Sequence, residues 1–420
     1  MPIVPADLRI EVRWIAPNPS RKVVLEDHSL LVRDGRILDI LPSALAAERY
    51  SARAVLQRNS HLLMPGMINA SSSAATLLFR GANGSATAPG RLVAPDFARD
   101  STLAAIAEML LSGITCFCDR GFFPEETAGA ANEQGMRTVL GMPVTDSPTP
   151  WAKDAAQCLT HALRLRDAHH GDPLVSTAFA PLAANNLTDA TFARLATLAD
   201  ELDAGIMIDL HQSTREIDAC VAAHGMRPIE RLWNLGLLTP ALNAAHMVHL
   251  NAKDMNLLQR TGISITVCPQ GALRMGEGLP PVAAIAAAGT RLGIGSTGTA
   301  TMNQDIWGDM KIVGLLANAW DALHAATQGG ASALGLDGEI GTLEAGKWAD
   351  LCCADLSRPG TQPVGDPVAQ LVFGGGRDIV SDVWVAGRQL LSGGELTRLD
   401  WPGVSARSTA WAARMREVDR

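Results

Sequence analysis

The sequence contains no apolar run as long as the roughly 18–20 residues that a membrane-spanning helix needs. Its first residues, MPIVPADLRIEVRW, carry charges where a secretion signal requires an apolar stretch, so we expect no leader. Basic residues are also in the minority, 35 against 43 acidic ones, and the net charge is −8. An acidic balance does not favour nucleic acid or an anionic membrane as a partner. We therefore expect a cytoplasmic protein with neither kind of partner.

The seven cysteines show no spacing that is typical of a disulfide framework, and Cys352 and Cys353 are adjacent. An odd number of scattered cysteines in a long chain favours reduced thiols. Cys116 and Cys118 have no second cysteine pair to complete a metal site, so we interpret them as part of a core strand.

The chain has 420 residues, of which 47% are apolar and 19% charged. This composition is typical of a globular, enzyme-like protein. The length allows two domains, or one large barrel with a satellite.

Both ends of the chain read as short strands. Residues 29–41 place Asp34-Gly35 between two apolar runs, which is a hairpin signal. Strand-like runs are also predicted at 349–356, 368–373 and 379–391. Neither end has enough apolar surface for its own core. We therefore predict that residues 1–60 and 345–420 together form one small discontinuous β-sandwich domain.

Residues 61–344 alternate apolar runs with segments of helical period, such as 101–112, 188–202 and 252–260. The apolar runs are 61–70, 114–118, 137–142, 174–180, 205–211, 243–250, 263–268 and 291–296. Continuous apolar strands separated by helices indicate a parallel sheet that is covered on both faces. Eight such units predict a (β/α)₈ barrel, with a doubly wound open sheet as the weaker alternative. In a barrel of this kind the chemistry lies at the carboxyl ends of the strands.

The segment 63–81, LMPGMINASSSAATLLFRG, resembles the first barrel strand of the amidohydrolase superfamily. The resemblance is to the branch of cytosine, adenosine and S-adenosylhomocysteine deaminases and of triazine hydrolases (chlorohydrolase-like proteins). It continues through HQSTREID, NAAHMVHLNAKDM, VCPQGALRMGEG and GIGSTGTATMNQDIWGDM, and covers nearly the whole chain. It implies a hydrolase of non-peptide C–N bonds, such as a deaminase of purine-like or triazine-like rings.

The same resemblance shows where this chain departs from its branch. Members bind one divalent metal through two histidines on the first strand, one on the fifth, one on the sixth and an aspartate on the eighth. His211 and His246 match the fifth-strand and sixth-strand ligands, but Ser71 and Ser73 stand for the first pair and Thr297 for the aspartate. The branch also has a proton-shuttling glutamate at the position of Thr214, and substrate-side histidines at those of Val267 and Leu182.

These replacements change what the site can do. A catalytic zinc site needs about three protein ligands plus a water, and hydroxyl groups are poor substitutes for imidazole and carboxylate. Without the metal a water keeps a pKa near 15.7 in place of roughly 7. Loss of the glutamate removes roughly 10²–10⁴-fold of acid–base catalysis. We therefore predict a degenerate metal site, and neither a metal nor another cofactor.

Two roles remain open for the surviving groups. His211 and His246 are either a catalytic base or relics held by local contacts, while His249 is interpreted as structural. The remaining candidates form a predicted ligand-binding ring at the mouth: Ser71, Ser73, Thr214, Cys268 and Thr297. A serine or Cys268 could act as a nucleophile beside a histidine, but no motif typical of such hydrolases surrounds them. Asp119 and Asp209 stay unassigned, because carboxylates at strand ends commonly cap a helix or pair with arginine.

Three hypotheses follow. The first is a metal-free, small-molecule-binding or regulatory homologue, with a nitrogen heterocycle as the candidate ligand. It would assemble as a homodimer or with an active paralogue. The second is a metal-independent hydrolase or lyase that acts on a nitrogen heterocycle or cyclic amide, with His211 or His246 as base. The third is a hydrolase that borrows a metal through both histidines and substrate atoms.

Overall fold

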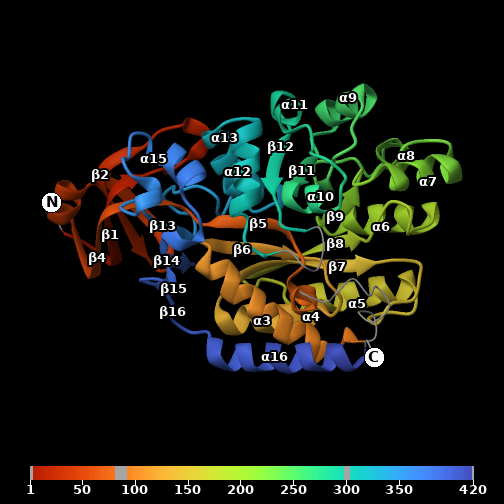
Figure 1. The fold of residues 1–420 in the computed structure, drawn as a ribbon, viewed down its shortest axis with the longest axis horizontal. Helices are drawn as coiled ribbons and strands as arrows, with labels where there is room; N and C mark the ends of the chain where they lie inside the picture. The colour runs from red at the N-terminus through yellow and green to blue at the C-terminus, as the bar shows by residue number, and fades with distance from the viewer. Residues whose placement is uncertain (1–2, 81–91, 298–302, 419–420) are drawn as a thin grey trace.

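The chain forms two eight-stranded sheets in the computed structural model, which describes residues 3–80, 92–297 and 303–418 (Figure 1). One sheet holds the middle strands in sequence order, from β5 to β12. The other holds strands from both ends of the chain, in the order β16-β15-β14-β13-β4-β1-β2-β3. The predicted (β/α)₈ barrel with a flanking β-domain built from both termini is confirmed. The flanking part, which was predicted as a small β-sandwich, is one mixed eight-stranded sheet.

Neighbouring strands of the barrel all run parallel to each other. The strands are β5 (Met67–Ser72), β6 (Ile114–Asp119), β7 (Arg137–Val144), β8 (Val175–Pro181), β9 (Gly205–Leu210), β10 (Leu242–His246), β11 (Ser264–Val267) and β12 (Arg291–Ile294). Each overlaps one of the eight predicted apolar runs. Continuous hydrophobic sequence was a dependable signal here, because these strands are covered on both faces.

The last strand meets the first at the carboxyl end of the barrel. The carbonyl oxygen of Ser71 accepts hydrogen bonds from the backbone N–H groups of Ser296 (2.9 Å) and Thr297 (3.1 Å). The buried Asn69 side chain adds two more contacts to Ser296, donating to its hydroxyl oxygen and accepting from its N–H. This junction places the Ser71 and Thr297 side chains next to each other.

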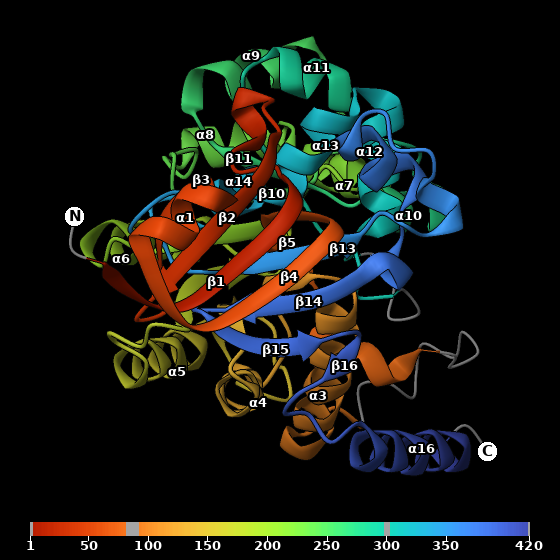
Figure 2. The same ribbon diagram turned by 90° about the vertical axis from the view of Figure 1, so that its left-hand side faces the viewer.

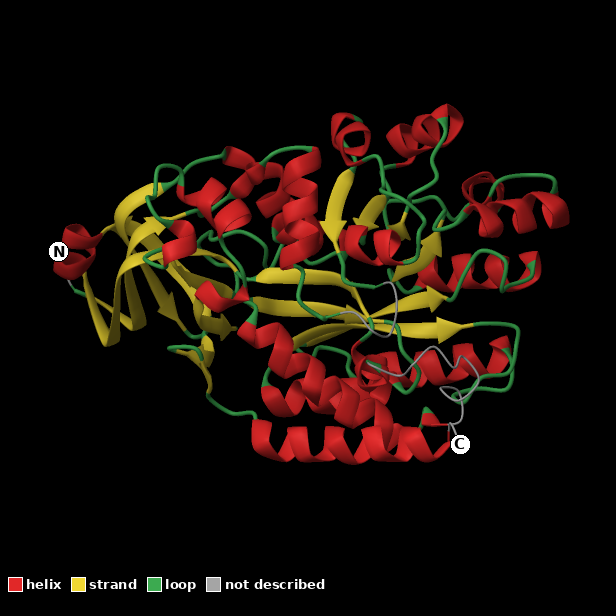
Figure 3. Ribbon diagram, in the orientation of Figure 1, coloured by secondary structure: helices red, strands yellow, loops and turns green. Residues whose placement is uncertain are grey.

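Helices surround the barrel (Figure 3). They are η2 (Ala74–Phe79), α3 (Pro95–Leu111), α4 (Pro124–Gln134), α5 (Ala155–Ala168), α6 (Asp189–Glu201), α7 (Thr214–His224), α8 (Pro228–Asn234), α9 (Ala252–Thr261), α10 (Pro269–Arg274), α11 (Val282–Ala287), α12 (Trp307–Leu316), α13 (Ala319–Ala326) and α14 (Gln328–Ala333). Several begin with a side-chain cap, such as Asn251 on α9 with its capping box. No described helix combines the length and hydropathy needed to cross a membrane.

Two predicted strands differ from the structure. The apolar run 61–70 is divided at Gly66, where a Cβ would lie about 2.2 Å from the Thr115 side chain. Its first part ends β4 in the terminal sheet and its second part is β5. The strand predicted at 368–373 is wrong: Pro367–Ala369 and Gln370–Gly374 are helical. Asp366 caps this segment and Pro367 occupies its first turn, which favours a helix despite the apolar sequence.

The terminal sheet faces the viewer in Figure 2. Its strands are β1 (Val4–Ile15), β2 (Leu25–Arg33), β3 (Arg36–Pro42), β4 (Tyr50–Pro65), β13 (Leu351–Asp355), β14 (Val380–Val385), β15 (Arg388–Ser392) and β16 (Glu395–Leu396). Strand β4 pairs antiparallel with β13, which joins the two ends of the chain. The smaller helical elements that accompany the sheet are η1 (Pro19–Arg21), α1 (Ser43–Arg49), η3 (Pro359–Thr361), α15 (Pro367–Ala369), η4 (Gln370–Gly374) and η5 (Arg377–Ile379).

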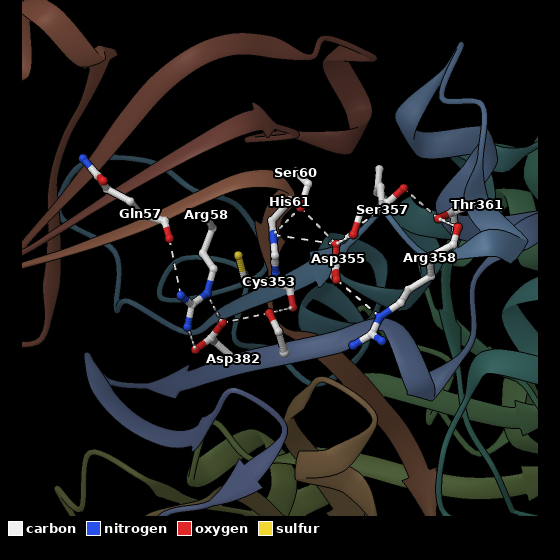
Figure 4. A network of polar contacts seen from close by, with 12 residues as sticks. Gln57, Arg58, Ser60, His61, Cys353, Asp355, Ser357, Arg358, Thr361 and Asp382 are labelled. Atoms are coloured by element: carbon white, nitrogen blue, oxygen red, sulfur yellow. Dashed lines mark hydrogen bonds and ion pairs between the residues drawn. The ribbon is translucent and has the colours of Figure 1, made fainter.

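A polar network reinforces this join between the ends of the chain (Figure 4). The guanidinium of Arg58 on β4 donates two hydrogen bonds to the buried carboxylate of Asp382 on β14, at 2.8 and 2.9 Å. The Ser60 hydroxyl donates to Asp355 on β13, at 3.0 Å. These hydrogen bonds join side chains on different strands of the same sheet, so we interpret the network as structural.

The last helix, α16 (Trp401–Val418), lies along α3 on the barrel side of the molecule (Figure 1). The rings of Phe97 and Trp411 meet edge to face, with their centroids 5.1 Å apart. Asp100 on α3 accepts hydrogen bonds from both Arg407 and Trp411. The sequence after β16 therefore packs on the barrel, although it was predicted as part of the terminal domain.

A buried ion pair fastens the terminal sheet to the base of the barrel. Arg137, the first residue of β7, donates two hydrogen bonds to Asp350, at 2.8 and 3.0 Å. Their side chains are only 5% and 2% exposed. Asp350 also accepts from the N–H of Ala386, and Arg137 also donates to the carbonyl oxygen of Pro173.

We expect Arg137→Met to lower the free energy of unfolding by about 3–5 kcal/mol, because it leaves the Asp350 carboxylate buried without its partner. The control is Arg13→Met, which removes exposed pairs to Glu26 and Asp27 and should cost less than about 1 kcal/mol. Urea unfolding of both variants measures the difference. Equal losses in the two variants would contradict this role of Arg137.

Candidate functional site

A guanidinium group occupies the mouth of the barrel, where the carboxyl ends of the strands meet. Arg120 follows β6 directly, and its Nη2 lies 2.6 Å from Asp209 Oδ1 on β9 and 3.1 Å from the hydroxyl oxygen of Ser71 on β5. The Ser71 hydroxyl is in turn 2.7 Å from that of Thr297. Arg120 thus connects three strands that are far apart in sequence.

The ion pair extends to one of the two predicted histidines. His246, the last residue of β10, places Nε2 3.3 Å from Asp209 Oδ1. Burial opposes ionisation of Asp209, but Arg120 and then His246 outweigh it and hold the pKa of this carboxyl well below its usual range. Burial alone would lower the pKa of Arg120, yet the charge of Asp209 raises it. Both groups are therefore charged at neutral pH.

A cavity of about 230 Å³ lies beside this pair. Its polar lining consists of Ser72, Ser73, Thr76, Arg120, Asp209 and Thr297, and its apolar lining includes Phe122, Ala180, Pro181 and Leu182. A larger cavity of about 430 Å³ lies at the opposite end of the barrel, around residues such as Val175, Gly205 and Arg291. Barrel proteins carry their chemistry at the carboxyl ends of the strands, so the smaller cavity is the candidate site.

Several buried polar atoms around the mouth have no hydrogen-bond partner among the residues that the structure describes. They are Arg120 Nε, Ser72 Oγ, His246 Nδ1 and Asp209 Oδ1, the last of which is held by its ion pairs alone. Arg120 and Ser72 both line the cavity. A buried polar atom without a partner costs roughly 1–3 kcal/mol, and native proteins usually satisfy such atoms. The cavity wall is therefore suited to a molecule that carries hydrogen-bond acceptors.

The other predicted histidine is turned toward neighbouring protein groups. His211 is fully buried, its Nε2 accepts from the N–H of Ile229 (3.2 Å) and its Nδ1 lies 3.1 Å from the carbonyl oxygen of His249. This pattern puts the proton on Nδ1. Burial lowers the pKa of His211 to about 4 and outweighs the opposing effects of the His249 carbonyl and Asp254. His211 is thus a neutral, fully hydrogen-bonded side chain here, which does not favour a role as base.

The backbone at these strand ends is unusual. His211, His246 and Met247 have φ angles of 53°, 75° and 50°. The left-handed region costs residues other than glycine of the order of 1–2 kcal/mol, and such conformations cluster at functional sites. The three strained residues therefore mark the ends of β9 and β10 as a candidate functional region.

The remaining candidates lie in different surroundings. Ser73 and Thr297 line the cavity. Thr214 is exposed and begins α7. Cys268 is buried beneath the mouth, and burial raises the pKa of its thiol far above the usual value, which disfavours a thiolate nucleophile. Asp119 accepts from the backbone N–H groups of Ala75 and Gly121.

The residues at the mouth do not fit a resident metal ion. The donors at the five positions that the resemblance assigns to metal ligands are three hydroxyls and two imidazoles, and both nitrogens of one imidazole contact protein groups. Among the described residues no three His, Cys, Asp or Glu side chains are grouped as a metal site requires. A guanidinium also stands 3.1 Å from Ser71, where it would repel a second cation.

Sequence reasoning did not identify Arg120 and Asp209 as site residues. Two signals pointed toward them: Arg120 lies just beyond the predicted strand 114–118, and Asp209 was left unassigned as a strand-end carboxylate of the kind that commonly caps a helix or pairs with arginine. Asp209 and His211 are two positions apart along the end of one strand, so both were within reach of the mouth. Their pairing across β6 and β9 required the structure.

Comparison with known proteins places these observations in context. A protein-family model described as the amidohydrolase family matches residues 62–390. A 5-methylthioadenosine/S-adenosylhomocysteine deaminase of Teredinibacter turnerae is 34% identical over 431 residues, which cover 97% of this chain and 98% of that protein. The enzyme of the same name from Saccharophagus degradans is 34% identical over 433 residues, or 98% and 97% of the two chains.

Solved structures are also similar to this chain. An adenosine deaminase from Xanthomonas campestris with bound zinc is 36% identical, with a TM-score of 0.96 and coverage of 99% of this chain and 100% of that one. The atrazine chlorohydrolase TrzN from Arthrobacter aurescens complexed with zinc shares the fold, with 22% identity, a TM-score of 0.89 and coverage of 96% and 99%.

The buried, neutral state of His211 predicts a pH dependence of stability. Its pKa is about 4 in the folded chain against an ordinary value of 6.5, so between these values the unfolded chain binds more protons. The free energy of unfolding should then decrease as the pH is lowered from about 6.5 to about 4, by about 3 kcal/mol for this residue. Urea unfolding of His211→Gln should show a correspondingly flatter profile. His170→Gln, at an exposed position, should keep the wild-type slope, and an unchanged slope in His211→Gln would contradict the prediction.

Proposed function

Because the chain belongs to the amidohydrolase family and is deaminase-like in sequence and fold, we propose that it binds a small nitrogen-heterocyclic molecule at the mouth of its barrel. We further propose that it does so without a resident metal ion. The observation that carries this proposal is the cavity beside Arg120 and Asp209, whose wall holds buried polar atoms that have no hydrogen-bond partner within the described ranges.

The cavity supports a ligand of limited size and mixed polarity. Its volume of about 230 Å³ is below the roughly 300–1,000 Å³ of pockets that enclose drug-sized ligands. Phe122, Pro181 and Leu182 provide an apolar wall, and hydroxyl and charged groups provide the polar one. A flat ring with polar edges matches such a lining.

The names of the relatives favour deamination of an adenosine-type substrate, and the residues at the mouth oppose the usual route to it. The zinc-bearing relatives belong to a family that activates water on a metal. In this chain Ser71, Ser73 and Thr297 offer no imidazole or carboxylate, and Arg120 already supplies a positive charge. The proposal follows these side chains, because function depends on the site and not on the fold.

One feature favours a second function, a metal-independent hydrolase or lyase. Asp209 and His246 form a carboxylate–histidine pair, and His246 Nδ1 lacks a partner among the described residues. A histidine oriented by a carboxylate can act as a general base. His246 is only 1% exposed and reaches the cavity through Asp209, so ligand binding remains the better supported function.

Metal analysis and calorimetry test the proposal. We expect the purified full chain to hold zinc and iron well below one ion per chain, also after incubation with zinc. We expect it to bind 5′-methylthioadenosine or adenosine without converting either. Thr76→Phe, which would fill the cavity, should abolish binding, while His170→Phe at the opposite cavity should leave binding unchanged. Stoichiometric metal together with deamination would overturn the proposal.

Turnover assays separate the second function from the first. If the chain is a metal-independent enzyme, conversion of a cyclic amidine or amide should persist in excess chelator. His246→Ala should then lose roughly 10²–10⁴-fold in rate, whereas Cys268→Ser should retain it. Binding of these compounds by the wild-type chain without any conversion would reject this second function.

A further inference from the structure

Arg120 and Asp209 form an ion pair, and both side chains line the same cavity. Their closest atoms, Nη2 and Oδ1, are 2.6 Å apart, and their side chains are 10% and 27% exposed. The guanidinium of Arg120 also contacts the Ser71 hydroxyl, at 3.1 Å, and the carboxylate of Asp209 contacts His246 Nε2, at 3.3 Å. The pair is therefore fixed in place by two further strands, while part of each group remains in contact with the cavity.

The pair presents both a donor and an acceptor to a ligand. A guanidinium has five N–H donors and no acceptor, and an ionised carboxylate accepts only. Arg120 Nε has no partner among the described residues, which leaves a buried donor available beside the cavity. Asp209 is held by Arg120 at 2.6 Å, lines the cavity, and is the more exposed of the two side chains, so its carboxylate oxygens remain accessible as acceptors.

The charges of the pair restrict the ligand. Arg120 and Asp209 are formally neutral together, so an anionic ligand would meet the carboxylate and a cationic ligand would meet the guanidinium. A like charge at such distances is costly in a partly buried site. A neutral ligand with an acceptor atom next to a donor group satisfies both partners without adding charge.

We infer that Arg120 and Asp209 form a recognition pair that selects the edge of a neutral cyclic amide or amidine. The ring nitrogen or carbonyl oxygen of the ligand accepts from Arg120, and the adjacent N–H donates to Asp209. The ring faces the apolar wall around Phe122, Pro181 and Leu182. This inference rests on the proposed function, since it names the ligand class of the same cavity.

Three small probes with the same shape test the pairing. In 9-methyladenine and 9-methylhypoxanthine an acceptor lies beside an N–H donor, whereas 9-methylpurine keeps its acceptors but has no N–H. A hydrogen bond to a charged group contributes roughly 1.5–3 kcal/mol, so calorimetry on the wild-type chain should show 9-methylpurine binding about 10- to 100-fold more weakly.

Variants assign that preference to the pair. Asp209→Asn keeps the shape but replaces the anionic acceptor with a neutral one, and should reduce the discrimination against 9-methylpurine. Arg120→Met should weaken all three probes. Arg58→Met is the matched control, because it breaks a buried pair in the terminal sheet far from the cavity, and it should keep both the affinities and their order. Circular dichroism establishes that each variant is folded.

The outcomes distinguish the two proposals. If none of the three probes binds the wild-type chain, both the proposed function and this inference fail. If they bind with equal affinity, or if folded Asp209→Asn keeps the wild-type preference, the recognition pair is rejected while binding at the mouth stands. If a variant does not fold, the affinities of the three probes for the wild-type chain alone test the recognition pair.

Discussion

The ion pair between Arg120 and Asp209 determines what the mouth of this barrel can hold. Arg120 reaches from the end of β6 to β9 and also contacts Ser71 on β5. It keeps a carboxylate ionised in a site where burial would otherwise favour protonation. A divalent ion placed among Ser71, Asp209 and His246 would lie within a few ångströms of the guanidinium. At such a distance the repulsion between like charges is of the order of kcal/mol even at an effective dielectric constant of about 20.

The backbone around this pair adopts unusual conformations at the strand ends. His211 and His246 both adopt left-handed conformations at the ends of adjacent strands, which side chains other than glycine adopt only at a cost. His211 has both ring nitrogens bound to protein groups, with Ile229 and His249 as partners. The strain is therefore balanced locally by hydrogen bonds, and its persistence does not require that the histidine still binds a metal.

The sequence predicted the scaffold well because its signals are local. Eight apolar runs correspond to eight barrel strands, and turn signals marked the terminal strands. The prediction at 368–373 failed because apolar content alone does not separate a strand from a short buried helix, and the cap at Asp366 carried the deciding information. The site was predictable only in part. Ser71 and Thr297 were expected at one mouth and are 2.7 Å apart. Arg120 was not identified, because a long side chain that pairs across three strands leaves no periodic or spaced pattern in the sequence.

The overall similarity of this chain is to a zinc-bearing deaminase, whereas the side chains at its barrel mouth are poor metal ligands. A TM-score of 0.96 to a zinc-bearing adenosine deaminase concerns the positions of strands and helices, and that similarity is compatible with many functions. A metal ion can act as a Lewis acid that brings the pKa of a bound water from 15.7 to roughly 7. A guanidinium supplies positive charge and oriented N–H groups, but it has no empty orbital and cannot coordinate water. What it can do well is hold a neutral, polar edge in a fixed orientation beside a carboxylate. For the proposed function, hydroxyls at the positions that the resemblance assigns to metal ligands, with an arginine beside them, suit a site of this geometry to recognising a ring.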